Sequence, residues 1–181
     1  MLSKRIIPQL LCRGRKLIKG KQFQSWRSVG VAAQAVRVYQ QRGVDELMLI
    51  DIGATPEGRG PDLGLIEELS EVCFMPLTVG GGIKTVADAR AVLRAGADKV
   101  AIGAGGGRSI RSIAGVCGSQ AVIAIINYQV NEISAVVHGV GYEQHWRHRR
   151  LVERAKRVEK LGAGEILLQC IDREGMMEGY D

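Results

Sequence analysis

The amino-acid sequence predicts an α/β fold in which a parallel sheet closes into a (βα)8 barrel. Short runs rich in Val, Ile and Leu alternate with amphipathic stretches along all 181 residues, an order that gives parallel strands. The apolar runs are continuous rather than alternating, as expected for strands that are covered on both faces. A related segment begins at Gly43, Gly96 and Gly162, in front of the second, fourth and sixth expected strands. Recurrence at every second strand is typical of a barrel built from duplicated units.

The expected elements account for about six of the eight βα units of such a barrel. Apolar, β-rich runs predict strands at 5–11, 46–52, 77–79, 99–102, 121–127 and 165–171, with an extra strand at 133–138. Amphipathic stretches predict helices at 31–42, 62–73, 86–95, 110–117 and 149–161. The chain stops after its sixth expected strand, so we expect residues 1–181 to form a single but incomplete barrel domain.

Composition favours a globular protein without a membrane span. Apolar residues make up 46% of the chain and charged residues 24%. No apolar run approaches the roughly 18–20 residues that a membrane-spanning helix needs, and no signal-peptide pattern precedes the first strand. We therefore expect a cytoplasmic protein with no membrane partner. The four cysteines never fall in a CxxC pair, so the sequence predicts neither a metal site nor a disulfide framework.

A basic run at 145–157 carries much of the formal charge of +6. Arg147, Arg150, Arg154 and Arg157 are spaced three or four apart and would form one stripe on a helix. Such a stripe could line the phosphates of a nucleic acid, but it is more often the solvated face of an outer barrel helix. We adopt the second interpretation and expect no nucleic-acid partner.

Two glycine-rich turns follow neighbouring strands and predict a phosphate pocket. Gly81 and Gly82 follow the third strand, and Gly103 and Ala104 follow the fourth. Backbone amides in front of a helix can hold a phosphate group, and glycines allow that group to come close. The alternative is that these glycines only permit tight turns.

Titratable side chains stand at the same ends of the strands. Asp51 closes the second strand, Lys19 lies just beyond the first, and Asp172 and Glu174 follow the sixth. Because the carboxyl ends of barrel strands carry the active site, these groups could serve acid–base chemistry. Alternatively, each carboxylate caps a turn or pairs with a neighbour.

A second charged set stands where the strands begin. Its members come from strands one, two, four and six and alternate in sign: Arg5, Glu46, Lys99 and Glu165. A barrel would gather them at its lower end as an ion-paired ring that plugs or gates the interior. The alternative is four exposed residues at strand entries.

Several segments match one known family, in order and with nearly its spacing. They include Lys4-Arg-Ile-Ile-Pro8, Pro76-Leu-Thr-Val-Gly-Gly-Gly-Ile83, Ala95-Gly-Ala-Asp-Lys-Val100 and Gly162-Ala-Gly-Glu-Ile-Leu-Leu168. On these segments the chain resembles the cyclase subunit of imidazole glycerol phosphate synthase, a lyase of histidine biosynthesis. The resemblance implies an eight-stranded barrel and no cofactor.

The resemblance also implies a partner, a substrate and a set of site residues. Ammonia from a glutaminase subunit would pass the gate formed by the charged set at the strand entries and meet a bis-phosphorylated substrate at the upper face. The products would be imidazole glycerol phosphate and an aminoimidazole ribotide. Asp98 would face the glutaminase. Substrate and phosphate binding would fall to Lys19, Asp51, Gly81, Gly82, Gly103, Ala104, Glu174 and Gly175.

The chain departs from the family where acid–base chemistry is expected. Leu11 stands where the family has one catalytic aspartate, and Asn127 stands where it has the other. Leucine carries no proton and an amide is a poor base, so each loss would cost about 10²–10⁴-fold in rate. The pattern also resembles a paralogous branch found with lipopolysaccharide sugar-modifying genes, which implies an ammonia conduit or scaffold for an enzyme that amidates a nucleotide sugar. Active cyclase and silent conduit both stay open at this point.

Overall fold

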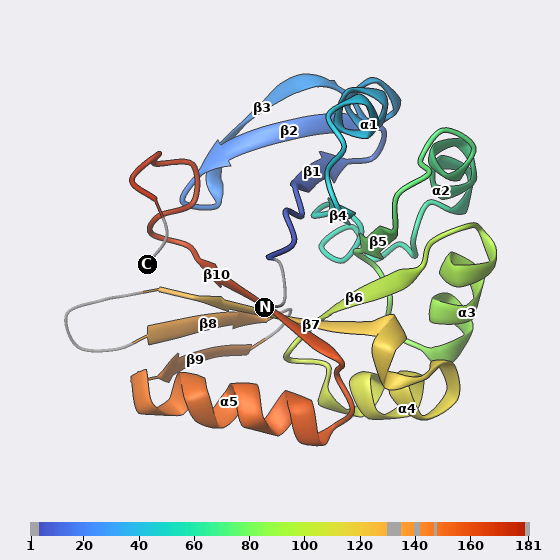
Figure 1. The fold of residues 1–181 in the computed structure, drawn as a ribbon. Coiled ribbons are helices and arrows are strands. Elements are labelled where there is room, and N and C mark those ends of the chain that lie inside the picture. The colour runs from blue at the N-terminus through green and yellow to red at the C-terminus, as the bar shows by residue number, and fades with distance from the viewer. Residues whose placement is uncertain (1–3, 130–134, 140–141, 147, 180–181) are drawn as a thin grey trace. The chain divides into compact units, whose positions relative to one another are not determined.

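The computed structural model of the protein describes residues 4–129, 135–139, 142–146 and 148–179. Its chain packs into two compact units. The first comprises residues 1–18, 28–83 and 87–101, and the second comprises 19–27, 84–86 and 102–181. Figure 1 labels the helices and strands of both.

The first unit is built on parallel strands. Its hydrogen-bonded order is β6-β5-β4-β1-β2-β3, in which β1, β4, β5 and β6 are parallel and β2 turns back antiparallel to β1. The strands β2, β3 and β6 continue into the second unit. The elements in chain order are β1 (Gln9–Arg13), β2 (Lys16–Lys21), β3 (Gln24–Val31), α1 (Ala32–Gln41), β4 (Leu47–Asp51), α2 (Leu63–Ser70), β5 (Leu77–Gly80), α3 (Val86–Arg94) and β6 (Lys99–Gly103).

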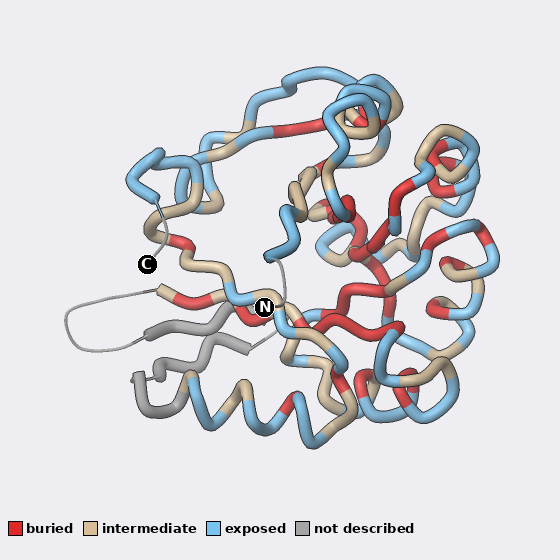
Figure 2. Tube along the Cα trace, in the orientation of Figure 1, coloured by how far each residue is buried: buried red, intermediate tan, exposed pale blue. Residues whose placement is uncertain are grey.

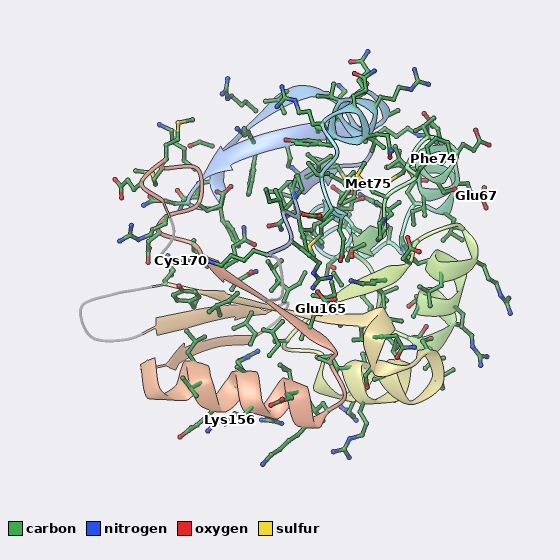
Figure 3. The ribbon with its side chains drawn as sticks, in the orientation of Figure 1. Glu67, Phe74, Met75, Lys156, Glu165 and Cys170 are labelled. Atoms are coloured by element: carbon green, nitrogen blue, oxygen red, sulfur yellow. The ribbon has the colours of Figure 1, made fainter. Side chains whose placement is uncertain are left out.

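The second unit contains the remaining parallel pair and an antiparallel hairpin. Strands β7 and β10 are parallel and in register from Ile123 opposite Glu165 to Tyr128 opposite Cys170, and Figure 3 labels these two end residues of β10. A separate two-stranded sheet joins β8 and β9. The elements are α4 (Gly107–Cys117), a 3-10 turn (Ser119–Ala121), β7 (Val122–Tyr128), β8 (Ala135–Gly139), β9 (Tyr142–Trp146), α5 (His148–Lys160) and β10 (Glu165–Cys170).

Strand β4 lies at the centre of the first unit's core. All five of its residues are buried, as are the four residues of β5, and Figure 2 shows these buried positions in red. Continuous burial explains why the sequence of β4 reads Leu-Met-Leu-Ile-Asp with no polar alternation, because both faces are covered. Helix α2 contributes Leu65, Ile66 and Leu69 to this core.

Local chemistry fixes the helix ends. Asp62 caps α2, and its Oδ1 accepts a hydrogen bond from the Leu65 amide at 3.0 Å. Gly96 follows α3 with a φ of +109°, and a Cβ there would lie 2.4 Å from the Ser70 Cβ. Only glycine therefore allows the chain to turn out of α3 so close to the end of α2.

Six strands correspond to the six predicted βα strands, but the first is shifted. The prediction of 5–11 is wrong at its start, because β1 begins at Gln9. Pro8 has no amide hydrogen to give a strand ladder. Ahead of it the Ile6 amide donates to the Asp45 carboxylate at 2.6 Å. Arg5 thus lies in an irregular segment rather than at a strand entry.

The strands β2, β3 and β9 were not predicted. Lys19, predicted just beyond the first strand, lies inside β2, and β3 follows that strand. Seven of the eight residues of β3 are exposed, so its sequence carries no apolar signal. The extra strand predicted at 133–138 corresponds to β8, which spans Ala135–Gly139; residues 133 and 134 lie outside the described residues, and its partner β9 was missed.

The burial pattern predicts unequal costs for two truncations in one region. Leu69 is fully buried in α2, whereas Phe74, in the loop after α2, is 80% exposed. Leu69→Ala should lower the free energy of unfolding by about 2–5 kcal/mol, because it leaves a cavity. Phe74→Ala should change it by less than about 0.5 kcal/mol. Urea denaturation followed by circular dichroism measures both, and equal effects would contradict this packing.

Candidate functional site

The carboxylate of Asp51 organises the loop after β4. As predicted, Asp51 is the last residue of its strand, and it is only 9% exposed. Its Oδ1 accepts hydrogen bonds from the amides of Gly53 at 2.9 Å and Ala54 at 3.3 Å. Its Oδ2 pairs with Nη1 of Arg59 at 2.8 Å. The carboxylate therefore caps a turn and pairs with a cation, both of which the sequence left as alternatives to acid–base work.

The glycine turn after β5 lies directly against this loop. Gly81 and Gly82 have φ values of +107° and +72°, which favour glycine. A Cβ on Gly81 would lie 2.3 Å from the Asp51 carbonyl oxygen, and one on Gly82 would lie 2.8 Å from the Arg59 carbonyl oxygen. The Gly82 amide donates to Thr55 Oγ1 at 3.3 Å. Close backbone approach is thus one reason for glycine here, and the structure brings Asp51, Gly81 and Gly82 together.

Arginines and carboxylates form a chain of ion pairs that leads outward from Asp51. Arg59 Nε contacts Glu57 Oε2 at 2.8 Å, and Glu57 Oε1 contacts Arg13 Nε at 3.1 Å. Hydrogen bonds from Arg59, and then from Arg13, lower the pKa of Glu57 below its ordinary value. The hydrogen bonds to Asp51 and Glu57 raise the pKa of Arg59, so its guanidinium stays charged. An open pocket of about 490 Å³ is lined by Arg13, Gly14, Glu57, Arg59 and Asp62.

Sequence reasoning missed Arg59, Glu57 and Thr55. The available signal was their place: they follow Asp51 within eight residues, in the loop that leaves the carboxyl end of a buried strand. The sequence does not show that this loop folds back onto the glycine turn, because the contact depends on the register of β5 beside β4.

The turn after β6 belongs to the second unit. Gly103 is the last residue of β6, and the Ala104 amide donates to the Ile125 carbonyl of β7 at 2.8 Å. Helix α4 begins at Gly107, directly behind the turn. The Ser109 hydroxyl donates to the Lys84 carbonyl at 2.6 Å, which joins α4 to the segment after the other glycine turn.

The predicted residues after β10 contact the β2–β3 hairpin, also within the second unit. The Gln22 amide donates to the Glu174 carbonyl at 2.9 Å, and the Phe23 amide donates to Glu174 Oε2 at 3.4 Å. A Cβ on Gly175 would lie 2.3 Å from the Gly20 carbonyl oxygen. Glu174 and Gly175 therefore hold the hairpin segment next to Lys19, whose side chain is exposed.

The two positions expected to lack catalytic carboxylates lie within strands. Leu11 pairs with Ile50 of β4 on one side and with Ile18 of β2 on the other. Asn127 lies near the end of β7, opposite Gln169. Its Oδ1 is buried and accepts no hydrogen bond from the described residues. Neither side chain can donate or accept a proton as an aspartate does.

Three of the four predicted gate residues contact one another in the first unit. Glu46 is 6% exposed; its Oε1 pairs with Nη1 of Arg5, and its Oε2 accepts from Lys99 Nζ at 2.8 Å. Glu46 therefore bridges two cations. Glu46 and Lys99 are shielded from water, whereas Arg5 is exposed, as the alternative of exposed residues at strand entries has it. Glu165 is the first residue of β10, in the second unit. Asp98 Oδ2, predicted at the partner interface, accepts from the Leu77 amide at 2.8 Å.

Fold and site together define a barrel-type α/β protein with glycine turns and a buried carboxylate at the ends of parallel strands. Residues 5–181 match the family described as "Histidine biosynthesis protein". The chain is 41% identical to Imidazole glycerol phosphate synthase subunit HisF of Exiguobacterium sibiricum over its whole length, which spans 74% of that relative. The subunits HisF of Dictyoglomus thermophilum and Caulobacter vibrioides are also 41% identical, with the whole chain spanning 73% and 71% of them.

The chain belongs to the histidine biosynthesis protein family, within its imidazole glycerol phosphate synthase subunit HisF group. This membership confirms the predicted α/β fold of (βα)8-barrel type. In the part of the chain that the structure describes, no helix is long and apolar enough to cross a membrane. Nor do the described residues gather three or more His, Cys, Asp or Glu side chains that could hold a metal ion.

Burial of Cys12 beside Asp51 predicts an inert thiol. Cys12 is fully buried in β1, and this burial, with a smaller effect of the Asp51 charge, raises the pKa of its thiol from 9.0 to about 12. At pH 8 a thiol-specific disulfide reagent should leave Cys12 unmodified in the folded protein and modify it after unfolding in denaturant. Mass spectrometry of peptides locates the modification, and rapid native labelling of Cys12 would contradict this account.

The same shift predicts a pH dependence of stability. The stabilising effect of the neutral, buried thiol is fully present below about pH 9 and is lost as the pH rises towards about 12. Relative to a Cys12→Ala variant, the wild type should therefore lose free energy of unfolding between pH 9 and 11. Denaturant titrations at each pH compare the two proteins, and parallel curves would refute the linkage.

Proposed function

We propose that this chain is the cyclase-type subunit of imidazole glycerol phosphate synthase, which receives ammonia from a glutaminase subunit and delivers it to a bis-phosphorylated substrate. In this proposal residues 1–181 belong to one barrel domain. The observation that carries the proposal is Glu46, a buried carboxylate held between Arg5 and Lys99 before β4. The names of the relatives support it, since each is a subunit of that synthase.

The ion-paired cluster suits a gate for a small neutral molecule. Ammonia carries no charge, so it can pass between charged groups without exchanging a counterion, provided that one pair opens. The Lys99 side chain is only 15% exposed, so its ion pair with Glu46 is shielded from water. This shielding strengthens the attraction between the two charges, which would keep the gate closed. Glu165 completes the set in this proposal, and Asp98 faces the glutaminase.

Phosphate binding would use the glycine turns and the hairpin. The turns at Gly81–Gly82 and Gly103–Ala104 stand in front of α3 and α4, whose N-terminal dipoles favour an anion. The Gly82 and Ala104 amides already donate to Thr55 Oγ1 and to the Ile125 carbonyl, so the glycines would contribute chiefly close backbone approach. Lys19 in β2 supplies a flexible cation with an exposed side chain. Glu174 and Gly175 position the hairpin that carries it.

A second candidate is a conduit that passes ammonia without cyclase chemistry. Leu11 and Asn127 favour it, because the carboxylates expected at those positions are absent. Such a conduit could serve an enzyme that amidates a nucleotide sugar. The three HisF relatives all carry the name of the synthase, which favours the cyclase.

Turnover distinguishes the two candidates. Under the first, the purified chain converts the phosphorylated ribulosyl substrate with saturating ammonium salt, and a glutaminase subunit with glutamine can replace that salt. Under the second, it binds and stimulates the glutaminase but forms no imidazole glycerol phosphate. The double variant Leu11→Asp with Asn127→Asp should raise the ammonium-dependent rate by about 10²-fold or more, since it adds acid–base groups. No gain over wild type would contradict the role assigned to these positions.

Removal of the charge of Glu46 should impair turnover with glutamine-derived ammonia more than turnover with added ammonium salt. Glu46→Gln leaves Arg5 and Lys99 without their shared anion, so the ratio of glutamine-dependent to ammonium-dependent turnover should fall. The free energy of unfolding should also fall by about 3 kcal/mol, as for other broken buried pairs. Glu71→Gln, an exposed change of the same chemistry, is the matched control. An unchanged ratio in a folded Glu46→Gln protein would exclude a gating role.

A further inference from the structure

Arg59 pairs with the Asp51 carboxylate, which lies beside the Gly81–Gly82 turn. We propose that Arg59 is a positioning residue that neutralises Asp51 and thereby allows the Gly81–Gly82 turn to hold a phosphate group. The inference rests on the phosphate-binding part of the proposed function and adds to it a residue that the sequence did not single out.

The contact between the turn and Asp51 creates the need for neutralisation. A Cβ on Gly81 would lie 2.3 Å from the Asp51 carbonyl oxygen and 3.0 Å from the Asp51 Cβ. A phosphate on this turn would therefore sit close to the Asp51 carboxylate, which is 9% exposed and poorly screened by water. Amides of its own loop engage Oδ1, but amide dipoles do not cancel the charge on Oδ2.

Arg59 supplies the missing charge and is held rigidly. Its Nη1 lies 2.8 Å from Asp51 Oδ2, and its Nε lies 2.8 Å from Glu57 Oε2. Two carboxylates thus fix the plane of one guanidinium, which reduces the entropy lost when a ligand binds. Among the described residues, Nη2 has no protein partner and remains able to donate to a phosphate oxygen.

The same loop shapes the room around the turn. The Arg59 carbonyl oxygen and the Gly60 carbonyl carbon each lie 2.8 Å from the Cβ position of Gly82. Gly53 lies close to the Arg59 guanidinium. A Cβ at Gly53 would be 3.2 Å from Arg59 Nη2 and 2.8 Å from Glu57 Oε1. Glycine at position 53 therefore leaves space for Arg59 to reach Asp51, and the backbone at Arg59 forms a wall of the turn.

The test measures binding of inorganic phosphate through the backbone amide NMR signals of Gly81 and Gly82. Wild type should show saturable shifts at both. Arg59→Met should weaken the affinity at least about tenfold, the factor expected from an uncompensated charge a few ångströms from the anion. The double variant Asp51→Asn with Arg59→Met has no charge to compensate and should recover affinity to within about threefold of wild type. That recovery would not follow if Arg59 had only a structural role.

The matched control is Arg15→Met, which removes a guanidinium whose ion pair is with Glu68 rather than with Asp51 or Glu57. It should bind phosphate with less than about twofold change. If Arg59→Met fails to fold, the double variant and Arg59→Lys, which keeps the charge, still test the idea, and failure of both to bind overturns it. Wild-type affinity in Arg59→Met overturns the role of Arg59 alone. Absence of shifts in the wild type overturns the phosphate assignment together with the inference, whereas the ammonia gate is tested separately by turnover.

Discussion

Two buried carboxylates bracket strand β4, and each has to be neutralised. Glu46 stands immediately before the strand and Asp51 ends it, at 6% and 9% exposure. A buried carboxylate without a partner costs several kcal/mol, so each end of the strand requires a cation. Arg5 and Lys99 serve the entry, and Arg59 serves the exit. The apolar residues between them are covered on both faces and hold the two charges apart by the length of one strand.

This arrangement separates two kinds of chemistry along a single element. Entries of parallel strands face one end of a barrel and exits face the other. In the proposed function, the first carboxylate would control a passage while the second would shape a ligand site. Each pair also ties its strand to a distant part of the chain: Glu46 connects β4 with β6 and with the segment before β1, and Asp51 connects β4 with the loop that covers the turn after β5.

The sequence predicts the parallel elements well because their burial leaves a strong signal. Continuous apolar runs locate β4, β5, β7 and β10 to within one or two residues. The β2–β3 hairpin lacks such a signal because β3 is exposed. In addition, Gln22 and Phe23 of its turn and Ser25 of β3 adopt positive φ values that no turn motif in the sequence indicates. Likewise, the pairing of Glu46 with Lys99 can be predicted because both residues stand where parallel strands begin. The pairing of Asp51 with Arg59 cannot, because it depends on the path of a loop, which the hydrophobic pattern of the sequence does not indicate.

Asn127 bears on how such a site could work without its expected carboxylates. Its buried Oδ1 lacks a donor among the described residues, and an unsatisfied buried acceptor costs about 1–3 kcal/mol. A ligand that carries an N–H or O–H group would remove that cost, while a carboxylate at the same position would also attract a proton. Leu11, in contrast, can only exclude water. In the proposed function, these two residues would therefore favour binding and orientation over proton transfer, and rate enhancement would come chiefly from proximity and from fixed charges.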